Sequence, residues 1–174
     1  MDAGADIIND ISALGDDPAM AGICAEYGAA VVLMHKKGNP LTMQDNPFYH
    51  DITAELRSFF DAAARCAVGA GIAREKIILD PGIGFGKALT DNLEILRLPS
   101  CLAKACGNDY PVLVGLSRKS LIGEITAHDA EGRLPGTLAA NAAAIMGGAD
   151  IIRVHDVKEH ADLVKVLYAL RAGK

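Results

Sequence analysis

Several features that mark common protein classes are missing from this sequence of 174 residues. No uninterrupted apolar run approaches the roughly 18 residues that a membrane-spanning helix needs, although 51% of the residues are hydrophobic and mean hydropathy is +0.21. The formal net charge is −5, and no basic run is longer than three residues, which argues against a nucleic-acid surface. We therefore expect a soluble protein that holds any anionic ligand through local groups.

Cysteine patterns that bind zinc or catalyse redox chemistry are also absent. The sequence has no CxxC pair and no histidine at zinc spacing from its cysteines, which are Cys24, Cys66, Cys101 and Cys106. Met1 leads directly into "DAGADIIND", which is not a signal-peptide pattern, and no low-complexity tract or linker follows. We predict buried or idle thiols in helical segments, a reducing cytoplasm, and a single domain over residues 1–174.

The glycine-rich stretch "DPGIGFGK", residues 80–87, matches neither common phosphate-binding motif. A P-loop needs glycine five residues before its Gly-Lys pair and Ser or Thr after it, but those positions are Pro81 and Ala88. The dinucleotide fingerprint fits Gly82 and Gly84, but its third glycine would fall on Lys87. The stretch therefore needs another explanation.

Apolar runs rich in β-branched residues alternate strictly with helical patterns along the chain. The runs cover residues 5–12, 29–35, 76–80, 111–117 and 149–155. The helical patterns cover residues 18–27, 51–69, 90–105, 134–146 and 158–170. This order, with nearly continuous apolar strands, predicts an α/β protein with parallel strands covered by helices.

An open doubly wound sheet and a closed TIM barrel both fit this alternation, and polar residues at the strand ends decide between them. Every run ends in a polar group: Asn9 and Asp10, His35, Asp80, Ser117 with Arg118 and Lys119, and Arg153 with His155. An open sheet gathers its site at one switch point, whereas a barrel collects residues from all of its carboxyl strand ends. We therefore predict the barrel.

Alternation along each strand separates two faces. One face carries the polar layer, which consists of Asn9, Asp80, Ser117, Arg153 and His155, with Met34 on the same side. The opposite face is wholly apolar, as expected of residues that pack on helices. The polar layer is therefore predicted to converge at the mouth of the barrel, and His35, which points outward, is predicted to be structural.

The sequence resembles the dihydropteroate synthase family in five motifs that follow one another in register: "IINDIS", "VLMHKKGNP", "LDPGIGFGK", "LVGLSRKSLIG" and "GTLAANAAAIMGGADIIRVHDV". The resemblance implies a TIM-barrel transferase (EC 2.5.1.15) of folate biosynthesis. Such enzymes join 6-hydroxymethyl-7,8-dihydropterin diphosphate to p-aminobenzoate with magnesium and release diphosphate. Members are commonly homodimers through late barrel helices.

The resemblance covers only the last five βα units of the family barrel, equivalent to strands 4–8. The family's magnesium-ligating asparagine, further loop residues for aminobenzoate and diphosphate, and a second pterin-binding aspartate belong to the first three units, so no metal ligand is expected in this chain. A partial barrel leaves residues 7–11 and 151–155 as unpaired edges, which predicts self-association.

For the pterin, the resemblance implies contacts from Asp80, Asn9, Met34 and Phe85. An ionised Asp80 would accept two hydrogen bonds from the 2-amino-pyrimidinone edge, and Asn9 would donate and accept along the same ring. Met34 and Phe85 would flank it. The alternatives are a turn-starting aspartate, a strand-capping asparagine and a core methionine.

For the diphosphate, the resemblance implies a cationic side of the site. Lys119 with Ser117 would contact the pterin and help to place the aminobenzoate, and Gly115 would leave room inside. Arg153 would stack on the pterin, and His155 would donate to a phosphate oxygen. Asp80, Lys119 and Arg153 are thus the expected catalytic groups, and no covalent nucleophile is required. The alternatives are a solvated basic loop at Lys119 and an ion pair from Arg153 or His155 to Asp156 or another carboxylate.

Other interpretations stay open at this stage. Arg118 would be structural or face solvent, and Lys36 and Asn39 depart from the family pattern at loop positions, where they would alter electrostatics at the barrel mouth. A non-catalytic pterin-binding or assembling remnant is one alternative function. A methyltetrahydrofolate methyltransferase is another, although methyl transfer needs no diphosphate site.

Overall fold

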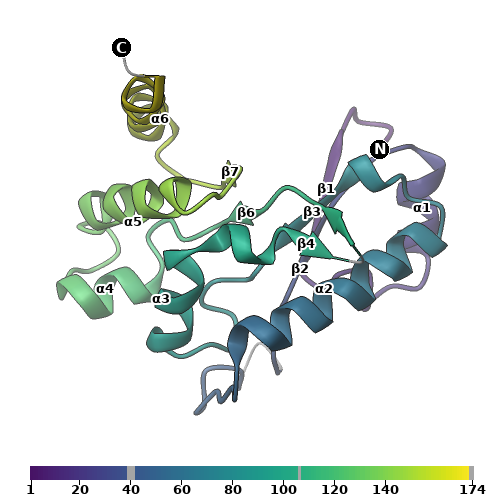
Figure 1. The fold of residues 1–174 in the computed structure, drawn as a ribbon, viewed down its shortest axis with the longest axis horizontal. Helices are drawn as coiled ribbons and strands as arrows, with labels where there is room; N and C mark the ends of the chain where they lie inside the picture. The colour runs from purple at the N-terminus through teal and green to yellow at the C-terminus, as the bar shows by residue number, and fades with distance from the viewer. Residues whose placement is uncertain (39–41, 106, 173–174) are drawn as a thin grey trace.

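The computed structural model describes residues 1–38, 42–105 and 107–172. Five parallel strands coincide with the five predicted runs: β1 (Ile7–Asp10), β2 (Ala30–Met34), β3 (Ile77–Asp80), β6 (Leu113–Val114) and β7 (Ile151–Ile152). The helices are α1 (Met20–Glu26), α2 (Ile52–Gly69), α3 (Leu89–Arg97), α4 (Ser120–Thr126), α5 (Leu134–Met146) and α6 (Val157–Ala172), with 3-10 turns at Arg74–Lys76 and Pro99–Leu102 (Figure 1).

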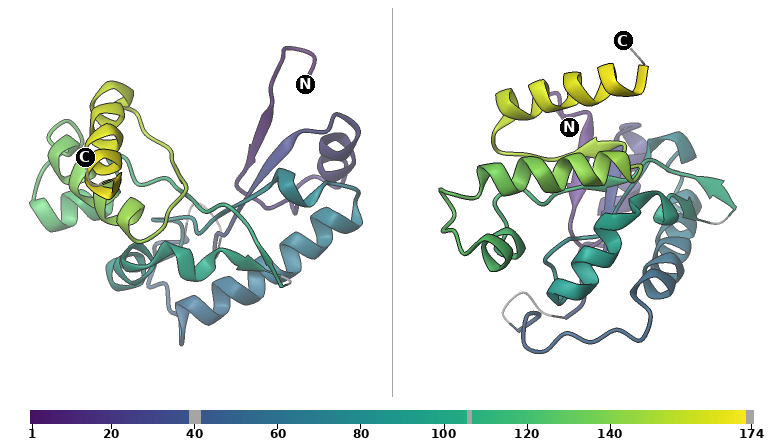
Figure 2. Two further views of the ribbon diagram at one scale, coloured as in Figure 1. Left: turned by 45° about the horizontal axis from the view of Figure 1, so that its top comes forward. Right: turned by 60° about the vertical axis from the view of Figure 1, so that its left-hand side comes forward.

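The strands lie side by side in chain order. β1 pairs with β2 and β2 with β3, a parallel bridge joins Leu79 to Val112, and β6 pairs with β7. The strands form an arc with helices along its outside, and β1 and α6 lie at opposite ends of it (Figure 2). This arrangement is the predicted partial (β/α)8 barrel.

Two separate apolar clusters confirm that the strands have an inner and an outer face. The outer cluster joins alternate strand residues such as Val31, Leu79 and Val114 to the helices. The small inner cluster contains the residues between them, Val32, Ile78 and Leu113, with Ile151 packed against it. Because the outer face is covered and the inner face is the one that carries the polar ends, the predicted alternation is correct.

Helix α2 shows how local sequence forms the outer layer. The side chain of Asp51 accepts a hydrogen bond from the N–H of Ala54 at 2.8 Å and so caps the first turn. Ile52, Leu56 and Phe60 recur at helical spacing and are at most 2% exposed. Burial of each such side chain stabilises the fold by roughly 2 kcal/mol.

The predicted helix over residues 90–105 is wrong in its second half. Helix α3 ends at Arg97, and Leu98 is no longer helical, with φ −151° and ψ 68°. Pro99 explains the break, because a proline removes a backbone donor and disfavours helical backbone in the residue before it. A short hairpin of β4 (Lys104–Ala105) and β5 (Asn108–Asp109) follows. Helix α4 was not predicted at all.

The cysteine prediction holds only in part. Cys24, Cys66 and Cys101 are free thiols, of which Cys24 is buried, Cys101 is partly exposed and Cys66 is exposed. Cys101 lies in a 3-10 turn and not in the predicted α-helix, and Cys106 lies outside the described residues. In the described ranges, no helix combines the length and apolarity needed to cross a membrane.

Candidate active site

The carboxylate of Asp80, at the end of β3, is the centre of the candidate site. Asp80 is 1% exposed and accepts a hydrogen bond from the N–H of Gly82 at 2.7 Å. Burial raises the pKa of Asp80, whereas the Gly82 N–H and the charges of Lys119, Arg153 and Lys87 act to lower it. A buried acid surrounded by cations is an arrangement that favours a ligand able to donate hydrogen bonds.

Lys119, which follows β6, lies beside this acid. Its ammonium donates to the carbonyl of Ile83 and lies 4.6 Å from the centre of the Phe85 ring. Burial lowers the pKa of Lys119 to about 8, against the opposing effect of Asp80 and with a further lowering by Arg153. The glycine-rich loop and the β6 loop therefore meet at this lysine.

Arg153 and His155 extend the site on the β7 side. The guanidinium of Arg153 lies over Gly115, where an added Cβ would come within 3.1 Å of its Nη2 atom, so Gly115 does leave the expected room. The Oγ atom of Ser117 lies 3.0 Å from Nδ1 of His155 and accepts from the His155 N–H at 3.2 Å. A hollow of about 370 Å³ is lined by Gly115, Ser117, Lys119, Arg153, Val154 and His155.

Met34 and Asn9 occupy the remaining inner-face positions. Met34 is 1% exposed and pairs in register with Asp80, and its Cγ lies 3.3 Å from where a Cβ on Gly82 would be. Asn9 pairs in register with Val32, two residues before the level of Met34, and is exposed. The structure therefore brings Asp80, Lys119 and Arg153 within electrostatic reach of one another, with Phe85 beside Lys119, and leaves Asn9 exposed on β1.

The glycine-rich loop packs directly on the backbone that follows β2. Gly82 and Gly86 have φ of +65° and +63°. A Cβ would lie 1.9 Å from the carbonyl oxygen of His35 at position 82, and 2.1 Å from that of Lys37 at position 86. Glycine at these positions is thus required by conformation and by contact, which explains the motif without a phosphate cradle.

Lys87 is a structural centre of this loop that sequence reasoning missed. Its side chain is buried at 3% exposure and donates to the carbonyls of Gly82 at 3.1 Å and Phe85 at 3.2 Å. Its Nζ atom lies 2.9 Å from Nδ1 of His35. Burial lowers the pKa of Lys87 to about 7. Its place directly after a glycine-rich loop is the one feature of the sequence that could have indicated this role. The comparison with the P-loop considered this lysine only as a phosphate ligand.

His35 faces the helices, as predicted. Its ring packs edge-on against Phe59 of α2, with 4.8 Å between ring centres. Burial, and then the charge of Lys87, lowers the pKa of His35 to about 3, so the ring is neutral at ordinary pH. His35 is therefore structural.

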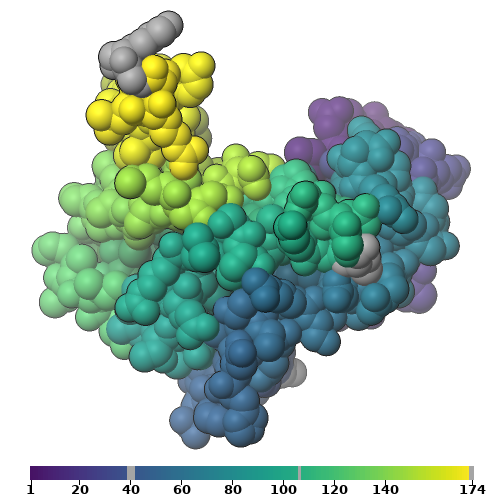
Figure 3. Space-filling view, in the orientation of Figure 1, coloured from purple at the N-terminus to yellow at the C-terminus, as the bar shows by residue number. Residues whose placement is uncertain are grey.

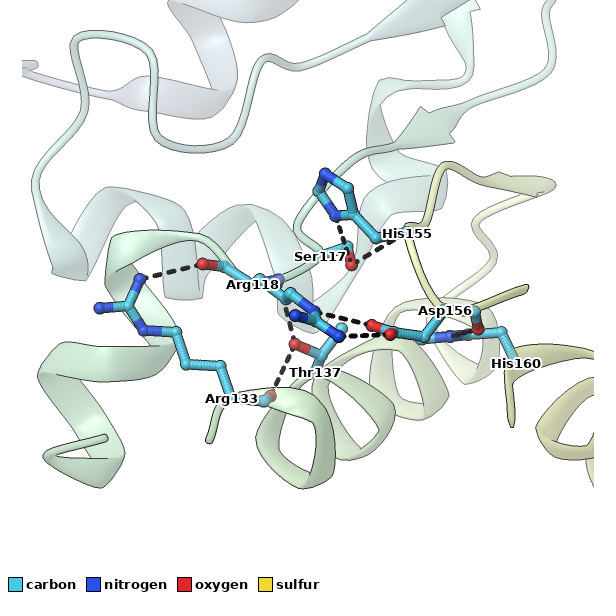
Figure 4. A network of polar contacts seen from close by, with 7 residues as sticks. All are labelled: Ser117, Arg118, Arg133, Thr137, His155, Asp156 and His160. Atoms are coloured by element: carbon cyan, nitrogen blue, oxygen red, sulfur yellow. Dashed lines mark hydrogen bonds and ion pairs between the residues drawn. The ribbon is translucent and has the colours of Figure 1, made fainter. Parts of the chain in front are cut away.

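Arg118 is also structural, because it pairs with Asp156 (Figure 4). Its Nε donates to Oδ2 of Asp156 at 2.9 Å, and its Nη2 donates to Oδ1. The hydrogen bonds from Arg118 lower the pKa of Asp156. Asp156 is thus the partner of Arg118, and the predicted alternative of an ion pair from Arg153 or His155 to Asp156 is wrong for the described residues.

Two further expectations concern Lys36 and Asn39 at the mouth of the barrel and the ligands of a metal ion. Lys36 forms an ion pair with Asp16 at 2.9 Å, which joins the loop after β2 to the loop after β1; Asn39 lies outside the described residues. Among the residues that the structure describes, no three His, Cys, Asp or Glu side chains gather to hold a metal ion.

Comparison with known proteins finds matches to one enzyme family. A family model described as "Pterin binding enzyme" matches residues 1–155. Dihydropteroate synthase of Escherichia coli (strain K12) is 48% identical over 172 residues, which cover 98% of this chain and 59% of the relative. The chain therefore spans about three fifths of the length of this relative.

Solved structures of the same family also match this chain. Yersinia pestis dihydropteroate synthase with a sulfonamide drug complex superposes with a TM-score of 0.93 and 41% identity, covering 99% of this chain and 62% of that one. The enzyme from Thermus thermophilus in complex with 6HMPPP gives 0.88 and 40%, covering 98% and 66%. Both neighbours extend beyond the matched part, as a partial barrel requires.

Proposed function

Because this chain belongs to the pterin-binding enzyme family, we propose that it supplies the pterin and diphosphate side of a dihydropteroate synthase. The reaction would condense 6-hydroxymethyl-7,8-dihydropterin diphosphate with p-aminobenzoate to give 7,8-dihydropteroate and diphosphate. The observation that supports this most is the buried carboxylate of Asp80 facing the cations Lys119 and Arg153 at the carboxyl ends of parallel strands.

Each part of the candidate site suits one part of this substrate. The two carboxylate oxygens of Asp80 would accept from the 2-amino group and the ring N–H of the pterin. Phe85, under the Lys119 ammonium, would flank the ring. Arg153 and His155 would bind the diphosphate, and both side chains are exposed and so free to meet it.

The chemistry needs no covalent enzyme intermediate. The bond between the pterin methylene carbon and the diphosphate oxygen breaks, and its electron pair leaves with the diphosphate. The arylamine nitrogen of p-aminobenzoate forms the new bond to the methylene carbon and then loses a proton to solvent. Asp80 would stabilise positive charge that develops on the pterin, and Lys119, Arg153 and His155 would stabilise negative charge on the leaving group.

Completion of the barrel and assembly are part of the proposal. On β1, Ile7 shares the inner face with Asn9 by alternation and is 52% exposed, and Ile11, directly after the strand, is 40% exposed. Such exposed apolar side chains suit a surface that further βα units cover. Magnesium is proposed from the resemblance alone, with ligands from outside this chain. A homodimer is proposed through the late helices, where α6 projects from the body (Figure 3) and Tyr168 is 74% exposed.

A methyltetrahydrofolate methyltransferase is the second candidate. It shares the pterin-binding acid, but it has no use for the cationic hollow of Lys119, Arg153 and His155. That hollow favours the synthase.

Calorimetric titration of the chain with pterin diphosphate and with methyltetrahydrofolate tests the proposal. We expect pterin diphosphate to bind at least about tenfold more tightly, since several charge-assisted hydrogen bonds are lost with the other ligand. Turnover is measured on a fusion of this chain to the first three βα units of the Escherichia coli relative, with both substrates and magnesium. We expect diphosphate release from the fusion and none from the chain alone. Tighter binding of methyltetrahydrofolate would favour the methyltransferase, and a fusion that binds neither ligand would identify a remnant.

A further inference from the structure

Two neighbouring loops carry the cationic side of the site, and they are joined at two successive positions. Ser117 and Lys119 lie on the loop after β6, and Arg153 and His155 lie at the end of β7. Ser117 bonds to His155 on the side of the hollow. The next residue of each loop forms the bidentate ion pair between Arg118 and Asp156 (Figure 4).

The backbone of Arg118 is held as firmly as its side chain. Its φ of +56° is in the left-handed region, which residues other than glycine seldom adopt. Its N–H donates to Oγ1 of Thr137 at 3.1 Å, and its carbonyl accepts from Nη1 of Arg133 at 2.9 Å. Thr137 in turn donates to the carbonyl of Arg133 at 2.8 Å. Helix α5 and its first flanking residue thus fix this turn of the β6 loop.

Asp156 is fixed to the same helix. Its carbonyl oxygen lies 2.7 Å from Nδ1 of His160, which must donate because a carbonyl only accepts. Nε2 of His160 then accepts from Nδ2 of Asn141 on α5 at 2.8 Å, and both side chains are buried. Helix α5 therefore anchors both loops, and the Arg118–Asp156 pair joins the two loops directly to each other.

This connection holds like charges together. Arg153 acts to lower the pKa of Lys119, as expected of two neighbouring cations, whereas the carboxylate of Asp80 acts to raise it and attracts both. Besides the charge of Asp80, several contacts hold these loops together in the described residues: the Ser117–His155 contact, the Arg118–Asp156 pair, the strand pairing behind them and the bonds of both loops to α5.

We propose that Arg118 and Asp156 are positioning residues that clamp the two cationic loops together and thereby set the affinity of the site for the diphosphate end of its ligand. Neither residue lines the hollow, so both act through Lys119, Arg153 and His155. The inference deepens the proposed function and rests on it for the identity of the ligand.

Substitution of Asp156 separates a clamp from a simple charge effect. Asp156→Asn removes a negative charge beside a cationic site, and by charge alone it would tighten anion binding. Arg118→Gly removes a positive charge and by charge alone would weaken it, and glycine accepts the left-handed backbone without strain. A clamp instead predicts the same loss from both variants, although their charge changes are opposite.

The experiment titrates the chain, both single variants and the double variant with three ligands. These ligands are the pterin diphosphate, the same 6-hydroxymethyl-7,8-dihydropterin without diphosphate, and inorganic diphosphate. We expect each single variant to bind both diphosphate ligands about tenfold more weakly, and the double variant to lose no more than either single variant, because all three break one interaction. Binding of the pterin alone should change by less than about twofold, a range within ordinary surface effects.

Asp162→Asn is the matched control, because Asp162 forms an exposed ion pair with Lys165 on α6, away from the hollow. Tighter anion binding by Asp156→Asn, or equal losses for all three ligands, would overturn the clamp. Wild-type chain that binds no diphosphate ligand would overturn it as well. Binding of inorganic diphosphate without binding of the pterin would instead contradict the proposed function and leave the clamp testable on the inorganic anion.

Discussion

Asp80→Asn is expected to weaken binding of the pterin about a hundredfold. The carboxylate is 1% exposed and already accepts a hydrogen bond from the N–H of Gly82, so it is held in place before a ligand binds. An asparagine at the same place would keep one acceptor oxygen and turn an NH2 group toward a ligand donor. Loss of hydrogen bonds to a charged group costs about 3 kcal/mol in total, which corresponds to the stated change.

Calorimetry measures this loss directly, and pterin fluorescence provides a second signal because the chain has no tryptophan. Asp109→Asn is the control: Asp109 lies on β5, and its side chain is 78% exposed. Thermal unfolding of both variants shows whether the fold stays intact, so that weaker binding can be assigned to the lost carboxylate. If Asp80→Asn bound the pterin within about threefold of wild type, recognition through this carboxylate would be wrong.

Gly82→Ala is expected to destabilise the folded state by at least about 3 kcal/mol, which is among the larger effects of single substitutions. Two costs combine. The left-handed backbone at φ +65° disfavours any Cβ by roughly 1–2 kcal/mol, and the added atom would come 1.9 Å from the carbonyl oxygen of His35, which is backbone and has little freedom to move.

Gly28→Ala separates the two costs. Gly28 has nearly the same φ, +61°, but nothing lies within 4 Å of its notional Cβ. Its substitution should therefore cost only the roughly 1–2 kcal/mol of backbone conformation. Urea unfolding of both variants gives the comparison. Equal losses of unfolding free energy would show that the close approach of the glycine-rich loop to β2 is absent in solution.

Local pattern predicted the strands and their faces because successive residues of a strand point to opposite sides of the sheet. Val31 and Val32 belong to different clusters although they are adjacent, and alternation alone assigns them. The same alternation placed Asp80, Ser117 and Arg153 on one face, whereas Lys119 followed only from its position just past a strand end. The helix predicted after Arg97 was wrong because a single proline outweighed an otherwise helical pattern of alanine and leucine.

The supporting contacts of the site could not be predicted in the same way. Lys87 bonds to His35, 52 residues away in sequence, and Arg118 bonds to Asp156, 38 residues away. Neither pairing leaves a periodic signal, because both join loops whose spacing depends on the assembled sheet. Sequence therefore identified residues that gather at the candidate site and missed the contacts that hold them in place.

A crystal structure of the chain with 6-hydroxymethyl-7,8-dihydropterin diphosphate tests the central claim most directly. We predict that the 2-amino edge of the pterin lies within about 2.7–3.2 Å of both carboxylate oxygens of Asp80, with the diphosphate held by Arg153 and His155. An ordered ligand bound elsewhere, with only water beside Asp80, Lys119 and Arg153, would contradict it.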